Sequence, residues 1–209
     1  NHSGTLPYDG IMINLAVYNE HSSGRYARFL VENFVFKLPL IGEFIERTGG
    51  VPACHENATE LIKKNEMLVV FPEGVKGISK TYDERYQLQR FGHGGFVKLA
   101  MRTGVPIVPV SVIGAEEIHP LIWKSKLLAQ IFQVPFIPLT PTFPWLGPLG
   151  LVPLPSKWKI VFGKPVSFSK FEPKDAENEK LVEKYTAKIR NEVQKTIDRE
   201  LVKRKSIWI

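Results

Sequence analysis

Two residues near the start of the sequence, His2 and Asp9, could together form a proton-transferring pair. A neutral imidazole that hydrogen-bonds a carboxylate through one ring nitrogen is held in one tautomer, and its second nitrogen is then free to accept a proton. Asp9 follows His2 by seven positions, so a tight turn or two helical turns would bring them together. Most such pairs are incidental, so this signal needs support from a second segment.

A second candidate segment, Phe71-Pro72-Glu73-Gly74, directly follows the clearest buried strand, which we expect over residues 67–71. Ligand sites of α/β sheets tend to lie at the carboxyl ends of strands. A glutamate held there between a proline and a glycine has a fixed backbone and could receive or orient a substrate hydroxyl. The cations that follow in a short loop would suit a phosphate: Lys76, Lys80, Arg85 and Arg90.

The elements that must position these segments alternate between short apolar strands and amphipathic helices. We expect helices over residues 7–19, 41–48, 57–64, 95–103 and 175–205, and strands over 51–53, 67–71 and 106–113. Residues 26–36 fit either a buried strand or a helix. Strand 67–71, helix 95–103 and strand 106–113 in this order predict a right-handed crossover between parallel strands. The fold class is therefore α/β, with a mixed, largely parallel central sheet flanked by helices.

The length of 209 residues fits a single domain over residues 1–209 with one substantial core. The candidate catalytic residues lie at its very first positions. A domain rarely begins in its active site, so we expect a segment upstream of Asn1.

Residues 127–156 carry no charge, but they include seven prolines. Each proline lacks a backbone donor and restricts its neighbour, which argues against a membrane-spanning helix. The segment could wrap the core, or its aromatic rings could lie in a bilayer interface. Both interpretations stay open, and the rings concerned are Phe132, Phe136, Phe143 and Trp145.

The composition limits the classes of partner. The net charge of +7 favours an anionic partner, which could be a nucleic acid, a membrane surface or a phosphorylated substrate. No nucleic-acid recognition motif is present, so we expect no nucleic-acid partner. Cys54 is the single cysteine, which excludes an internal disulfide and favours a reducing, cytosol-facing location. No histidine pair has metal-ligand spacing, so we expect no metal.

The order of His2, Asp9, Phe71-Pro72-Glu73-Gly74 and Val105-Pro106-Ile107-Val108-Pro109 resembles that of the glycerolipid acyltransferase family over nearly the whole chain. This family includes lysophosphatidate and glycerol-3-phosphate acyltransferases. The resemblance implies transfer of a fatty acyl group from acyl-CoA or acyl-carrier protein to a hydroxyl of a lysoglycerolipid in phospholipid biosynthesis. It implies a chain associated with the cytoplasmic face of a membrane, no cofactor, and no covalent acyl-enzyme.

The resemblance also implies roles for particular residues. His2 would be the general base and Asp9 would orient it. The acceptor site would comprise Phe71, Pro72, Glu73, Gly74 and Lys76, with Lys76 at the position of the family's usual arginine. The acyl channel would be lined by Val105, Pro106, Ile107 and Pro109.

The sequence departs from the family pattern in ways that bear on the acceptor. Six residues separate His2 from Asp9 where the family usually has four, and residues 50–56 lack the arginine that usually contacts phosphate. A non-phosphorylated alcohol is therefore an alternative acceptor, and a non-catalytic membrane-binding module with the same fold is an alternative function. Ser3 and Cys54 are weaker candidates as nucleophiles, because the chain has no G-x-S-x-G motif and Cys54 adjoins His55 directly.

Overall fold

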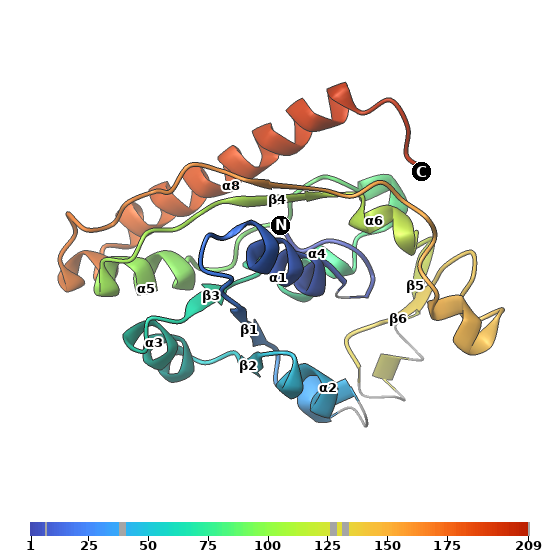
Figure 1. Cartoon of the computed structure of the whole chain (residues 1–209), viewed down its shortest axis with the longest axis horizontal. Coiled ribbons are helices and arrows are strands. Elements are labelled where there is room, and N and C mark those ends of the chain that lie inside the picture. The colour runs from blue at the N-terminus through green and yellow to red at the C-terminus, as the bar shows by residue number, and fades with distance from the viewer. Residues whose placement is uncertain (7, 38–40, 126–128, 131–133, 209) are drawn as a thin grey trace.

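The structure is a computed structural model, and it describes residues 1–6, 8–37, 41–125, 129–130 and 134–208. Three parallel strands form one sheet, with β1 (Ala27–Val31) between β2 (Gly50–Pro52) and β3 (Met67–Val69). The helices α2 (Ile41–Arg47) and α3 (His55–Lys63) connect successive strands of this sheet. The predicted α/β class, with a parallel sheet flanked by helices, is confirmed (Figure 1).

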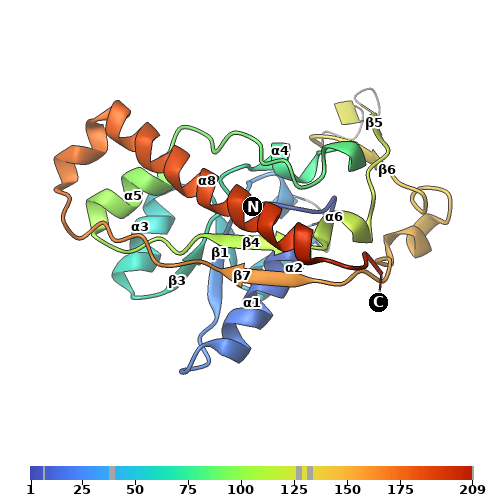
Figure 2. The same ribbon diagram turned by 90° about the horizontal axis from the view of Figure 1, so that it is seen from above.

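A second layer consists of two antiparallel strands, β4 (Val110–Ile113) and β7 (Lys159–Phe162). The long helix α8 (Glu179–Lys203) crosses one face of this pair, and α1 (Tyr8–Glu20) lies on its other side (Figures 1 and 2). Buried side chains of α1 pack with β4 and with residues of β3, so α1 lies between the two strand layers. This position holds the first turn of α1, which carries Asp9, at the centre of the molecule.

The predicted crossover from residues 67–71 through helix α5 (Gly95–Thr103) to residues 106–113 is wrong. In the described part of the chain β4 pairs with β7 alone, with Val112 opposite Ile160, and it does not join the sheet of β3. The strand is also shorter than predicted. Proline has no N–H to donate to a ladder, so residues 106–109 contribute a single bridge between Ile107 and Val166.

The ambiguous segment 26–36 contains the strand β1, and a short 3₁₀ turn, η1 (Val35–Lys37), begins at its end. The segment forms no α-helix. Helix α3 starts two residues before its predicted start. Cys54 is its N-cap, and the Cys54 Sγ accepts the N–H of Asn57, while the side-chain amide of Asn57 donates to the Pro52 carbonyl oxygen. Asn57 therefore lies inside the helix and is not its N-cap.

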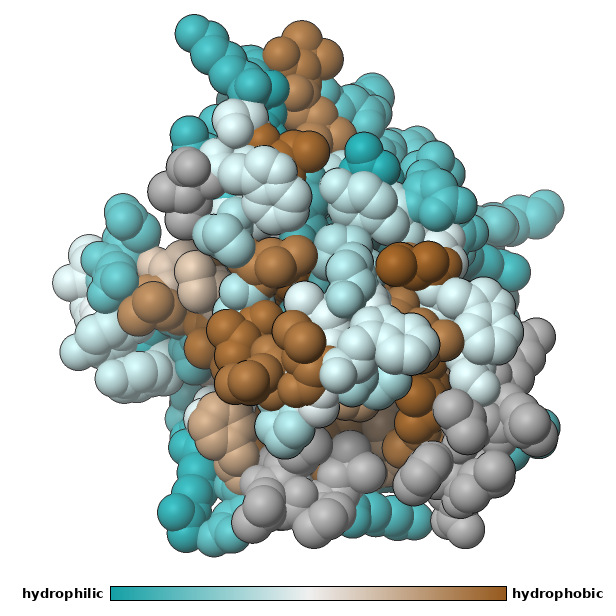
Figure 3. Space-filling view, turned by 90° about the vertical axis from the view of Figure 1, so that its right-hand side faces the viewer, coloured by the Kyte–Doolittle hydropathy of each residue, from teal (hydrophilic) through white to brown (hydrophobic). Residues whose placement is uncertain are grey.

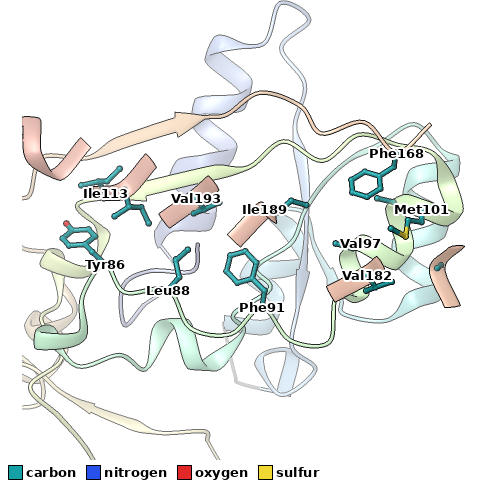
Figure 4. Close-up of a cluster of buried hydrophobic side chains, with 13 residues drawn as sticks. Tyr86, Leu88, Phe91, Val97, Met101, Ile113, Phe168, Val182, Ile189 and Val193 are labelled. Carbon is teal, nitrogen blue, oxygen red and sulfur yellow. The ribbon is translucent and has the colours of Figure 1, made fainter. Parts of the chain in front are cut away.

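Apolar side chains along the last helix face the largest core. Val182, Ile189, Val193 and Ile197 of α8 are buried in one cluster with side chains of α5, with Phe168 and with Ile113 of β4 (Figure 4). Burial of each such side chain contributes about 1.5–3 kcal/mol. The helix begins at Glu179, later than predicted, because residues 173–177 form a 3₁₀ turn, η4 (Pro173–Glu177), before it.

The remaining elements are short. Two of them, α4 (Val75–Ile78) and η2 (Tyr82–Glu84), follow the Phe-Pro-Glu-Gly segment. Helix α6 (Ala115–Ile118) follows β4, and β5 (Trp123–Ser125) pairs with β6 (Ile137–Leu139) in an antiparallel hairpin. A 3₁₀ turn, η3 (Gly147–Leu151), ends the uncharged stretch, of which residues 127–128 and 131–133 lie outside the described residues. No helix in the described part of the chain is long and apolar enough to cross a membrane.

Candidate active site

His2 and Asp9 form a close pair at the start of α1. Nδ1 of His2 lies 2.8 Å from Oδ2 of Asp9, and the Asp9 side chain has no exposed surface while 13% of the His2 side chain is exposed. The same Oδ2 accepts the main-chain N–H of Ser3 at 2.8 Å, and Oδ1 accepts that of Gly10 at 2.9 Å. Asp9 also lies in the first turn of a helix, where the helix dipole favours a negative charge. The carboxylate is thus fixed from several directions.

This arrangement determines which nitrogen of His2 can act as a base. An ionised carboxylate only accepts hydrogen bonds, so Nδ1 carries the proton and Nε2 carries the lone pair. Nε2 makes no hydrogen bond to any residue that the structure describes. The imidazole ring stacks on Phe71, with ring centroids 4.2 Å apart and an angle of 26° between the planes. The ring is therefore held in orientation while its free nitrogen stays available.

The buried carboxylate of Glu73 joins three segments of backbone. Its Oε1 accepts the main-chain N–H of His2 at 2.9 Å, and its Oε2 accepts that of Gln89 at 2.7 Å. Both oxygens are thus used to hold the backbone at His2 and at the loop before α5. The contact predicted between Glu73 and an acceptor stays a prediction. What the structure shows is a carboxylate that positions the backbone of the histidine.

Gly77, which sequence reasoning missed, lets α4 approach His2 closely. A Cβ at Gly77 would lie 2.7 Å from the carbonyl oxygen of His2 and 2.9 Å from the Cβ of Glu73. Only glycine fits this contact without a shift of backbone. Its neighbour Lys76 is exposed and makes no hydrogen bond or ion pair to a described residue. The structure therefore places a free cation one residue from the His2 contact.

Asn1 was also missed, and it fixes the segment that carries His2 to the strand layer. Its side-chain oxygen accepts the N–H of Val112 at 2.7 Å, and its side-chain amide donates to the Val112 carbonyl oxygen at 3.1 Å. Neither Asn1 nor Gln89 has a sequence signal, because both act through contacts with distant backbone. Gly77, by contrast, lies only four positions after Glu73, and a glycine so close to a candidate site residue is a signal that could have pointed to it.

Two of the four cations expected to surround a phosphate have other partners. Lys80 is buried in an ion pair with Glu116, and burial raises the pKa of the Glu116 carboxyl, an effect that the charge of Lys80 opposes. Arg85 lies over the ring of Tyr82, 4.3 Å from its centroid, and donates to the Tyr82 carbonyl oxygen. Lys80 is therefore not a phosphate ligand. Lys76 and Arg90 are the exposed members of the set.

The residues predicted to line an acyl channel lie away from His2 and its ring partner. Val105 and Ile107 pack against the large core formed with α5 and α8, whereas Phe71 belongs to the smaller cluster around α1. Pro106 is exposed, and the carbonyl oxygen of Pro109 accepts the N–H of Gly163. Their channel role stays a prediction, and the structure assigns the two aliphatic side chains a packing role. Within the described residues, no group of three potential metal ligands occurs.

The fold and the site define an α/β protein with a histidine–carboxylate pair that can activate a hydroxyl. Residues 1–113 match the sequence profile of the family described as Acyltransferase, and the chain belongs to this family. An uncharacterized protein of Mycobacterium tuberculosis is 47% identical over 208 residues, which cover 100% of this chain and 58% of that protein. The 1-acyl-sn-glycerol-3-phosphate acyltransferase BAT2, chloroplastic, of Brassica napus is 32% identical over 116 residues, 51% of this chain and 32% of that protein.

A solved structure is also similar. The crystal structure of the 1-acyl-sn-glycerophosphate (LPA) acyltransferase, PlsC, from Thermotoga maritima aligns with a TM-score of 0.48 and 23% identity, covering 86% of this chain and 58% of that chain. The chain spans less than two thirds of the length of the curated relatives described above.

Proposed function

We propose that this chain transfers a fatty acyl group from an acyl thioester, acyl-CoA or acyl-carrier protein, to a hydroxyl of a lysoglycerolipid at the cytoplasmic face of a membrane. His2 is the general base of this reaction. The observation that carries the proposal is the 2.8 Å contact between Nδ1 of His2 and Oδ2 of the buried Asp9, which leaves Nε2 free for a substrate proton. Family membership supports the reaction class.

The proposed reaction has two steps. Nε2 of His2 removes the proton of the acceptor hydroxyl as its oxygen attacks the thioester carbonyl carbon, and a C–O bond forms. The tetrahedral intermediate collapses, the C–S bond breaks, and the leaving thiolate takes the proton back from His2. The products are an ester and a free thiol. Asp9 stabilises the imidazolium between the two steps, and general-base help of this kind typically contributes ~10²–10⁴ in rate.

The two side chains that could form a covalent acyl-enzyme are poorly placed for it. The hydroxyl of Ser3 is fully buried, so a thioester cannot reach it without local unfolding. Cys54 is exposed, but its Sγ caps α3 and its neighbour His55 contacts Arg102. Both observations support direct transfer between the two substrates.

The acceptor is proposed to carry a phosphate, which Lys76 would contact. Lys76 is exposed, unpaired among the described residues, and adjacent to the glycine that touches His2. A lysine contacts phosphate as a point charge without the two-pronged geometry of arginine. Specificity for a phosphate should therefore be modest, and a neutral alcohol acceptor is the competing outcome of the test.

The test is thiol release from palmitoyl-CoA with a panel of acceptors: lysophosphatidate, glycerol-3-phosphate, lysophosphatidylcholine, monoacylglycerol and a long-chain alcohol. Wild type is compared with His2→Ala and with His21→Ala, a matched control because His21 is exposed and its side chain bonds only Ser23 among the described residues. Acceptor-dependent release that His2→Ala abolishes and His21→Ala preserves supports the proposal. Release that persists in His2→Ala would refute the role of His2, and no release with any acceptor would favour the non-catalytic module.

A Lys76→Ala variant decides the acceptor class. If the acceptor phosphate contacts Lys76, the KM for lysophosphatidate rises while the KM for a neutral acceptor stays the same. Equal KM values in Lys76→Ala and wild type for both acceptors would remove Lys76 from the acceptor site.

A further inference from the structure

The end of the uncharged stretch forms an exposed apolar surface, which we call the apolar tip. Its side chains are between 43% and 73% exposed, and they belong to Trp145, Leu146, Leu149, Leu151 and Val152. It lies at the side of the molecule that also carries the β5–β6 hairpin, where Ile122 and Trp123 are exposed (Figures 1 and 3). Figure 3 shows hydrophobic side chains gathered on this face.

The apolar tip is a folded loop that directs its polar groups inward. The Thr140 hydroxyl accepts the N–H of Phe143 at 2.8 Å, and the Thr142 hydroxyl donates to the carbonyl oxygen of Gly150 at 3.0 Å. A Cβ at Gly150 would lie 2.6 Å from the Thr142 carbonyl oxygen, so the loop closes tightly on itself. Backbone groups whose hydrogen bonds are made within the loop do not need water as a partner. A loop of this kind can therefore contact a lipid phase.

The charge around the apolar tip favours an anionic partner. Residues 153–158, which follow the tip, include Lys157 and no aspartate or glutamate. Lys157 is exposed directly after the tip, and its main-chain N–H bonds the carbonyl oxygen of Ile207. This bond brings the C-terminal segment, with the exposed Lys205, against the same region. Two copies of such a basic surface would repel each other, which disfavours self-association through the tip.

The apolar tip also contacts the catalytic helix. The hydroxyl of Tyr8 donates to the carbonyl oxygen of Leu151 at 3.4 Å, and the Tyr8 ring stacks on His119. Tyr8 is the first residue of α1 and adjoins Asp9. The tip is therefore tied to the first turn of the helix that carries Asp9.

We infer that the apolar tip inserts into the interface of an anionic lipid bilayer and so presents the active site to acceptors that stay in the membrane. Trp145 has an amphipathic ring of the kind enriched at this depth, and the exposed Lys157 and Lys205 would meet acidic headgroups. The inference rests on the proposed function for the lipid nature of the acceptor, and it names the surface through which the chain meets the membrane.

The first experiment is flotation of the protein with vesicles of phosphatidylcholine alone and of phosphatidylcholine with phosphatidylglycerol. Wild type is compared with the double variant Trp145→Ser/Leu149→Ser and with Val202→Ser, a control residue on α8 that is 89% exposed. We expect binding to the anionic vesicles, weakened by salt, with an affinity at least about tenfold lower in the double variant, which corresponds to 1.4 kcal/mol. Val202→Ser should bind like wild type.

Equal binding of the double variant and wild type to anionic vesicles would overturn the inference. So would a wild-type dimer in size-exclusion chromatography that the double variant abolishes, because the tip would then cover a second copy. Vesicle binding is measured without any acyl donor, so it can succeed even if the proposed reaction fails. Conversely, His2→Ala should float like wild type while it transfers no acyl group.

Discussion

The main-chain N–H of His2 donates to Oε1 of Glu73 at 2.9 Å, across 71 positions of sequence. The other oxygen of Glu73 accepts the N–H of Gln89. Through these two bonds the Phe-Pro-Glu-Gly segment holds the backbone that carries the candidate base, while Asp9 holds its ring. Backbone and side chain of His2 are thus positioned by two different carboxylates, and their removal should have different kinetic consequences.

Replacement of Glu73 by glutamine should lower kcat and leave the KM of the acceptor nearly unchanged. The amide NH₂ would face one of the two main-chain N–H groups, so one buried donor would lose its partner at a cost of about 1–3 kcal/mol. The measurements are steady-state kinetics and urea unfolding, with Glu183→Gln on the exposed face of α8 as the matched control. A large rise in the acceptor KM at constant kcat would instead show that Glu73 binds the acceptor.

The variant Asp9→Asn should reduce kcat by about 10²–10⁴. A carboxamide can present an NH₂ group to Nδ1, which would favour the tautomer with the proton on Nε2 and remove the base. Thiol release from palmitoyl-CoA measures this loss, and circular dichroism checks that the chain is folded. Asp83→Asn is the control, because Asp83 is exposed. Activity of Asp9→Asn close to wild type would exclude the pair as the catalytic base.

The variant Gly77→Ala should be inactive, whereas Gly95→Ala should keep its activity. The Cβ of an alanine at Gly77 would lie 2.7 Å from the His2 carbonyl oxygen, so α4 or His2 must move. Gly95, at the start of α5, has nothing within 4 Å of such a Cβ, and alanine there should raise the unfolding free energy by about 0.4–1 kcal/mol. Activity assays and urea unfolding of the two variants test the pair. Full activity of Gly77→Ala would show that the contact with His2 can relax freely.

Low pH should weaken the ion pair between Glu200 of α8 and Lys159 of β7. Hydrogen bonds from Lys159, then Lys203 and Arg199, lower the pKa of the Glu200 carboxyl from 4.5 to about 2. A depressed pKa in the folded state means that this stabilisation is complete above the ordinary pKa and is lost as the pH falls from there toward 2. Urea unfolding at about pH 5 and pH 3 should therefore show a smaller pH-dependent loss of stability in Glu200→Gln than in wild type. An equal pH-dependent loss of stability in the variant and in wild type would show that the ion pairs of Glu200 do not stabilise the fold.

Local patterns in the sequence determined several features correctly. The first helix, α5 and the last helix depend on near neighbours, so the sequence alone predicted them. A strand at residues 67–69 was also predicted, but it is shorter than the expected 67–71 and half-buried. The residue types of His2 and Asp9 also indicated a proton-transferring pair, and the structure brings the two side chains together.

The tertiary structure decided the features that depend on which distant segments meet. The pairing of β4 with β7 in place of β3, the burial of Lys80 against Glu116, and the use of Glu73 by two main-chain donors have no local signal. The position of the uncharged stretch also has no local signal. Its composition was compatible with wrapping the core and with lying in a bilayer interface, and only the folded structure shows that Trp145 is exposed. A side chain's type limits what it can do, and the contacts made by the folded chain determine what it does.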